Sequence, residues 1–119
     1  MQTESISSEA PKTGLDRRRF PRHRLSTPVT VWLSDGSAVR AMTLEISVSG
    51  LSACTSTPMK VGDEVGIEPI GGGKAPAIVR RKLGNVYGLE FLRLANEQAG
   101  EVQRLCSRLP LYNGGATGI

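Results

Sequence analysis

Hydrophobic and polar residues alternate along most of the chain with the two-residue period of half-buried strands. Residues 28–34 show this alternation first, and Asp35-Gly36 then marks a tight turn. Comparable β-compatible runs occupy residues 38–44, 51–55, 65–70, 77–83 and 86–92. Five to six short strands at roughly ten-residue spacing, with turn signals between them, predict a closed or nearly closed antiparallel barrel.

The hydrophobic period lengthens near the C-terminus. One predicted helical face carries Ala99, Val102, Leu105, Cys106 and Leu109. Asn96 is predicted to be the N-cap and Pro110 to stop the helix, which gives a helix over residues 96–109. Gly100 lies inside it and weakens it by roughly 1 kcal/mol, so we expect the helix to depend on docking against the barrel.

The 119 residues have room for one mainly β domain, predicted to span 15–111. Within it we expect an arginine-rich arm at 16–25, the barrel at 28–93 and the helix at 96–109. Residues 1–14 are polar with little to bury, and residues 112–119 are rich in glycine, so both are predicted to be flexible tails. No apolar run suits a signal peptide or a membrane span, which favours a cytoplasmic location without membrane insertion.

Catalytic and metal-binding chemistry find little support. His23 is the one histidine, and it lies among arginines rather than beside a candidate nucleophile. The 11 carboxylates are scattered along the chain, and Cys54 and Cys106 lack the spacing of a zinc or redox pair. We therefore expect no enzyme activity, no metal and no cofactor, and we interpret both cysteines as small buried residues.

Positive charge is concentrated in residues 16–24. The chain has 15 Lys+Arg and 11 Asp+Glu, a net of +4, and the five arginines of this segment account for the whole excess. Without them, 10 basic residues face 11 acidic ones. Guanidinium groups suit phosphate oxygens and the acceptor edge of guanine, so we expect a phosphate-bearing, guanine-containing ligand or polymer. The alternative is a solvated basic arm.

Two short motifs make the ligand hypothesis more specific. Arg18 and Arg22 are separated by three residues, and Glu45-x-Ser47-x-x-Gly50 lies between the second and third predicted strands. An arm that enters before the first strand can lie across that turn. The arginines would then face a carboxylate, a hydroxyl and a glycine that permits close approach, a set complementary to a guanine nucleotide.

These motifs resemble those of PilZ domains. Arg18–Arg22 matches the RxxxR motif, and Glu45–Gly50 matches the motif written D/N-x-S-x-x-G. Val61-Gly62-Asp63 and Tyr87–Phe91 are also typical, so the resemblance covers about residues 17–109. It implies a six-stranded antiparallel barrel with a closing helix, which binds the bacterial second messenger cyclic di-GMP.

By this resemblance, Arg18 and Arg22 would hold guanine and phosphate, and Glu45, Ser47 and Gly50 would form the opposing wall. Arg17 and Arg19 would make auxiliary contacts. Position 45 departs from the family pattern, because glutamate carries its carboxylate one methylene further than aspartate. We expect binding to survive with reduced affinity.

We expect the chain to act as a stand-alone receptor or adaptor that signals to an effector protein. The arm, crowded with like charges, is expected to become ordered when an anionic ligand neutralises it. One alternative is a PilZ-like protein-interaction module that has lost nucleotide binding. A small nucleic-acid-binding barrel is the other, although the chain offers few aromatic side chains for stacking bases.

Overall fold

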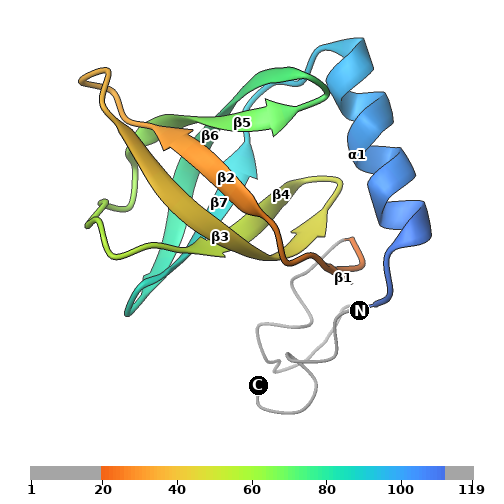
Figure 1. Ribbon diagram of the computed structural model, residues 1–119, viewed down its shortest axis with the longest axis horizontal. Helices are drawn as coiled ribbons and strands as arrows, with labels where there is room; N and C mark the ends of the chain where they lie inside the picture. Colours follow the sequence, from red (N-terminus) through yellow and green to blue (C-terminus); the bar gives the residue numbers. More distant parts are fainter. Residues whose placement is uncertain (1–19, 112–119) are drawn as a thin grey trace, which may run out of the picture.

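Seven strands and one helix make up residues 20–111, the part of the chain that a computed structural model describes (Figure 1). The elements are β1 (His23–Arg24), β2 (Pro28–Trp32), β3 (Ala38–Ser47), β4 (Gly50–Cys54), β5 (Glu64–Ile70), β6 (Gly73–Leu83), β7 (Val86–Phe91) and α1 (Asn96–Arg108). The two predicted tails and the first part of the predicted arm, which includes Arg17, Arg18 and Arg19, lie outside the described residues.

Six of the strands close into an antiparallel barrel, which confirms the predicted fold. The strand order is β3-β2-β5-β6-β7-β4, and β4 pairs back onto β3 to complete the ring. β1 is an additional strand, paired with β3 through His23↔Ile46 and Arg24↔Glu45. It uses the same edge of β3 that β2 uses, because β4 occupies the other edge. Within the predicted arm, His23 and Arg24 therefore lie along β3, on the edge that β2 also uses.

Two strands extend beyond their predicted bounds. β3 continues through Ser47, although residues 45–50 read as a polar interruption, and β6 begins at Gly73 rather than at residue 77. In β3 a register shift against β4 disturbs the alternation and conceals the strand in a simple period-two reading. The start of β6 alternates regularly in burial, but its Gly73 and Pro76 are residue types that strands disfavour.

Aliphatic side chains fill the barrel, as the shortage of aromatic residues requires. Val31, Ile67 and Val79 are completely buried. Tyr87 is the large aromatic residue of the core, and its hydroxyl accepts a hydrogen bond from the backbone N–H of Met59 at 3.1 Å. Burial of these alternate positions is the main stabilising contribution to the barrel.

Helix α1 runs across one end of the barrel and buries Gln98, Val102 and Cys106 (Figure 1). The predicted N-cap is wrong, because Ala95 caps the helix and Asn96 is already helical. Ala95 has no polar side chain. Its backbone N–H is instead satisfied by Oε1 of Gln98 at 3.1 Å, so a residue inside the helix replaces the expected cap.

Gln98 also fixes the helix to the β5–β6 turn. Its Nε2 donates to the carbonyl oxygens of Ile70 and Lys74, each at 3.1 Å. Gly71 in that turn has φ +59°, and a Cβ there would lie 2.9 Å from Cα of Gln98. The turn therefore needs glycine both for its backbone conformation and for the approach of the helix. No helix within residues 20–111 is long and apolar enough to cross a membrane.

Candidate functional site

A β-bulge in β3 turns polar side chains to the outer face of the barrel. Thr43 pairs with Ala53, but Glu45 pairs with Ser52, so Leu44 is an extra residue on β3. After the bulge, Ile46 pairs with Leu51 in the core. Residues on either side of Ile46 must therefore face outward, since successive strand residues point to opposite faces. The bulge thus places Glu45 and Ser47 together on the outside of the barrel.

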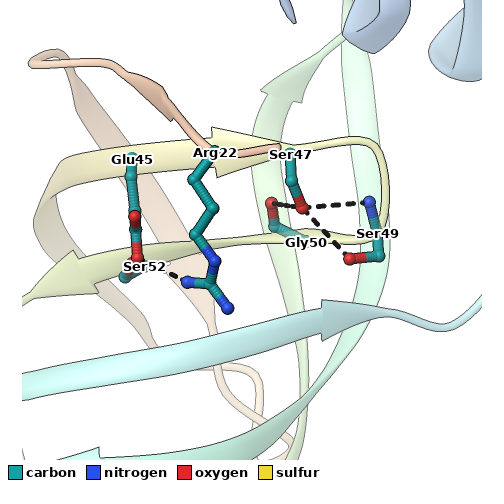
Figure 2. Close-up of polar contacts among 6 residues, drawn as sticks. All are labelled: Arg22, Glu45, Ser47, Ser49, Gly50 and Ser52. Carbon is teal, nitrogen blue, oxygen red and sulfur yellow. Dashed lines mark hydrogen bonds and ion pairs between the residues drawn. The ribbon is translucent and has the colours of Figure 1, made fainter. Parts of the chain in front are cut away.

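Glu45 contacts both Arg22 and Ser52 on this face (Figure 2). Its Oε2 accepts hydrogen bonds from Nη1 of Arg22 at 2.5 Å and from the hydroxyl of Ser52 at 2.7 Å. The Glu45 side chain is only 9% exposed, and that of Arg22 is 23% exposed. Residues 23 positions apart in the sequence are thus joined by a largely buried, charge-assisted hydrogen bond.

The other carboxylate oxygen of Glu45 is a buried acceptor without a donor. Oε1 is shielded from solvent and accepts no hydrogen bond from residues 20–111. An unsatisfied buried polar atom carries a desolvation cost that a suitable donor relieves. The geometry therefore leaves an acceptor available to an N–H group of a ligand, directly beside the guanidinium of Arg22.

Ser47 and Gly50 shape the turn between β3 and β4 (Figure 2). The Ser47 hydroxyl accepts from the backbone N–H of Ser49 at 3.2 Å and lies 3.0 Å from the Ser49 hydroxyl. Gly50 lies against the backbone of β7, where a Cβ would stand 2.1 Å from the carbonyl oxygen of Leu89. Both residues of the motif therefore have structural roles, and Gly50 is required by strand packing whatever binds nearby.

The outer faces of β3, β4, β6 and β7 together form a cavity of about 180 Å³. Four predicted site residues line it, namely Arg22, Glu45, Ser47 and Gly50. The opposite wall includes Arg80, Arg81, Gly88 and Glu90. The structure thus brings the second motif and half of the first into one cavity. Arg17, Arg18 and Arg19 precede the described residues.

The wall formed by β6 and β7 was not predicted from the sequence. A second bulge lies between Val79 and Arg81, and it places Arg81 opposite Gly88. Nε of Arg80 forms an ion pair with Oε1 of Glu90 at 2.6 Å. Three consecutive basic residues at positions 80–82 were the sequence feature that could have indicated this wall. Which face of the sheet each of them occupies, however, depends on the bulge.

The strand that follows Arg22 is held along both edges. On one side β1 pairs with β3, and on the other the backbone N–H of Arg24 donates to the carbonyl oxygen of Pro110 at 2.8 Å. Nδ1 of His23 lies 3.1 Å from the carbonyl oxygen of Leu109. His23 also forms an isolated antiparallel β-bridge with Leu111. The position of Arg22 is therefore coupled to the segment after α1.

Metal-binding and thiol chemistry gain no positive support from the geometry. Among residues 20–111, no group of three or more His, Cys, Asp or Glu side chains is arranged to hold a metal ion. Cys54 and Cys106 are both free thiols. Cys106 is buried, as predicted, and burial raises the pKa of its thiol, whereas Cys54 is only half-buried. The cavity described above is thus the candidate site.

Comparison with known proteins gives a family and several related folds. The family model for the PilZ domain matches residues 16–108. The crystal structure of the PilZ domain of CeSA from a cellulose-synthesizing bacterium is 27% identical, with a TM-score of 0.58, and the match covers 71% of this chain and 92% of that one.

Two further solved structures share the fold. The PilZ domain of YcgR from Escherichia coli, solved with c-di-GMP, is 21% identical with a TM-score of 0.60, covering 78% of this chain and 91% of that one. The Bacillus subtilis inhibitor of motility MotI/DgrA is 18% identical with a TM-score of 0.62, covering 77% of this chain and 51% of that one. No curated protein matches the chain.

Proposed function

The chain belongs to the PilZ domain family, and on that premise we propose that it is a bacterial, cytoplasmic receptor for cyclic di-GMP. The observation that carries the proposal is the unfilled acceptor Oε1 of Glu45, buried beside the guanidinium of Arg22. Guanine presents two adjacent N–H donors on one edge and two acceptors on another. A carboxylate oxygen and a guanidinium side by side complement such a molecule.

Arg22 retains donors for a ligand even while it contacts Glu45. A guanidinium has five N–H groups, and the contact with Oε2 uses Nη1. We expect the remaining donors to bind a phosphate oxygen or the O6/N7 edge of guanine. Arg18, which completes the RxxxR motif, is proposed to contribute a second guanidinium, and Arg17 and Arg19 auxiliary contacts. The PilZ domain of E. coli YcgR, solved with c-di-GMP, supports this choice of ligand.

Glutamate at position 45 is proposed to lower affinity without abolishing binding. Its longer side chain reaches Arg22 and Ser52 at once, through a single oxygen. Because Glu45 already offsets the charge of Arg22, the remaining donors of Arg22 attract a phosphate less strongly than those of an unpaired guanidinium would. An aspartate at position 45 would reach Arg22 less easily. The buried acceptor Oε1 still has no partner among the described residues.

The proposed output is a change in the surface around β1. Because β1 lies between β3 and residues 109–111, ligand contacts to Arg22 would stabilise the arm and the segment after the helix together. Ordering these segments costs conformational entropy, which charge-assisted hydrogen bonds offset. An effector protein could then recognise the combined surface.

Calorimetric titration of cyclic di-GMP into the wild type, Arg18→Ala and Arg22→Ala tests the proposal. We expect saturable binding that either substitution abolishes, while Arg93→Ala, an exposed arginine outside the cavity, binds like wild type. If the wild type gives no heat, Glu45→Asp is titrated next. Failure of that variant as well would favour a protein-interaction module that has lost nucleotide binding.

The nucleic-acid alternative is separated by salt and by competition. Polymer binding through the arginine arm should fall steeply with salt and show little preference for a guanine dinucleotide. Tyr87 is buried in the core, and the Trp32 ring is covered by Nζ of Lys74, 4.6 Å from its centroid. Tyr87 therefore offers no platform for stacking a base and Lys74 competes for the Trp32 ring, so we regard the nucleotide as the better-supported ligand.

A further inference from the structure

The charges around the cavity leave one arginine without a counter-charge. Three arginines and two glutamates line it, and 3 − 2 gives +1. Glu45 is engaged by Arg22, and Glu90 is engaged by Arg80. The Arg81 side chain forms no ion pair or hydrogen bond with any residue in the described part of the chain. The excess positive charge of this region of the cavity therefore belongs to Arg81.

Backbone geometry holds the Arg81 side chain over the cavity floor. The bulge in β6 sets Arg81 opposite Gly88 on β7. A Cβ on Gly88 would lie 3.4 Å from Nε, 3.5 Å from Cβ and 3.8 Å from Nη2 of Arg81. The whole arginine side chain therefore packs across the glycine, in the space that a larger residue on β7 would take. Although Arg81 is exposed to solvent, this packing places its side chain at the cavity.

We propose that Arg81 binds a phosphate of the nucleotide, from the wall opposite Arg22. This inference rests on the proposed function and extends it to a residue outside both sequence motifs. The physical reason is charge. A cyclic dinucleotide carries two phosphates, whereas the positive charge of Arg22 is already offset by Glu45 at 2.5 Å. An unpaired guanidinium on the far wall supplies both the missing charge and the two parallel donors that suit a phosphate.

Arg80 and Glu90 support this role indirectly. An unpaired Glu90 in the same wall would repel a phosphate. The Arg80–Glu90 ion pair, at 2.6 Å, compensates that negative charge. Both side chains are about half exposed, so the pair contributes little to stability. Its proposed consequence is electrostatic, because it leaves Arg81 as the group available to the ligand.

Lys82 provides a matched control for Arg81. It is the next residue on β6, carries the same charge and does not line the cavity. Its Nζ lies 5.7 Å from the centroid of the Tyr87 ring. A general loss of positive charge would therefore affect Arg81→Ala and Lys82→Ala alike, whereas a direct contact would affect only the first.

Calorimetric titration of cyclic di-GMP into the full chain and these two variants tests the inference. We expect Arg81→Ala to bind about 10-fold to 100-fold more weakly, as for loss of a charge-assisted hydrogen bond. Lys82→Ala should stay within about 2-fold of wild type. Arg81→Lys keeps the charge but not the forked donors, so its affinity should fall between those of wild type and Arg81→Ala. Unchanged thermal melting of each variant establishes that the fold is intact.

Three results would overturn the inference. Wild-type affinity in Arg81→Ala would remove Arg81 from the site while leaving the receptor function in place. Equal weakening by Arg81→Ala and Lys82→Ala would assign the effect to overall charge. Absence of binding in the wild type and in Glu45→Asp would reject the receptor function, and this inference with it.

Discussion

Glu45 joins Arg22 and Ser52 through one carboxylate oxygen, and this makes the two neighbours interdependent. Arg22→Ala would leave a largely buried carboxylate with Ser52 as its remaining donor. Because Arg22 is partly exposed, we expect a loss of about 2 kcal/mol in the free energy of unfolding, below the range for a fully buried pair. Urea denaturation measures it.

A double-mutant cycle isolates the ion pair from the rest of that effect. In a Glu45→Gln background no buried charge is left uncompensated, so Arg22→Ala should cost about 1 kcal/mol less than in the wild type. Strictly additive effects of the two substitutions would show that the contact contributes nothing to stability. Because the unfolding free energies of Arg22→Ala and Glu45→Gln are measured in this cycle, a loss of ligand binding in either variant can be distinguished from a loss of folding.

Gly50 and Gly88 lie on neighbouring strands of the site, yet they should respond differently to a methyl group. In Gly50→Ala the new Cβ would stand 2.1 Å from the carbonyl oxygen of Leu89, a backbone atom that cannot move alone. We expect a loss of about 3 kcal/mol, at the upper end for overpacking. In Gly88→Ala the nearest atom is Nε of Arg81, at 3.4 Å on a flexible side chain.

The second glycine is therefore the control for the first. Thermal melting should show a large fall in Tm for Gly50→Ala and a small one for Gly88→Ala. Similar melting temperatures for the two variants would contradict the assignment of Gly50 to strand packing.

At the scale of the element, one buried glutamine connects α1 to the barrel. Gln98 donates to two carbonyl oxygens of the β5–β6 turn and accepts from Ala95 at the start of the helix. Gln98→Ala removes all three hydrogen bonds and leaves acceptors unsatisfied. We expect a loss of about 2 kcal/mol in the free energy of unfolding. Gln103→Ala, on the exposed face of the same helix, should change it by less than about 0.5 kcal/mol.

The buried thiol of the same helix predicts a pH dependence. Burial raises the pKa of Cys106 in the folded protein, so the native state keeps its proton where the unfolded chain has lost it. This stabilising contribution is complete below the ordinary thiol pKa of about 8.5 and is lost as the pH rises through the folded-state value. Chemical denaturation between pH 7 and 10 should show falling stability, with a shallower fall in Cys106→Ala.

The strands and the helix were predictable because their buried positions follow regular periods. Val29 and Val31 in β2, and Val102 and Cys106 in α1, are buried where the pattern expects. The bulges were not predictable, because an extra residue on one strand is defined only by the strand opposite. Two partly aligned strands must be known before Leu44 can be identified as the residue without a counterpart.

The same limitation explains which site residues the sequence could supply. Arg22, Glu45 and Ser47 could be selected from their spacing and chemistry, and they do share a cavity. Ser52 and Arg81 could not, since neither lies in a motif and the face that each occupies follows from a bulge. Gln98 was missed because a polar residue at a helix start is usually exposed, and its burial depends on the turn it contacts.

At the scale of the whole molecule, the two ends of the described chain meet beside the site. β1 lies next to β3, and residues 109–111 lie along its other edge (Figure 1). Any group that holds Arg22 in place therefore also restricts the segment after the helix. The coupling is reciprocal, because a partner that binds this segment must favour the same position of β1.

Truncation after Leu109 tests this coupling, with truncation after Leu111 as its control. The shorter chain loses the Arg24–Pro110 hydrogen bond and the bridge from His23 to Leu111, whereas the control keeps both. Because β1 must then be ordered by the ligand, we expect cyclic di-GMP to bind about 3-fold to 10-fold more weakly to the shorter chain. Without ligand, amide exchange at Arg24 should also be faster in the shorter chain than in the control. Saturation with cyclic di-GMP should slow that exchange. Equal affinity and equal exchange in the two truncated chains would show that the segment after the helix is not coupled to the site.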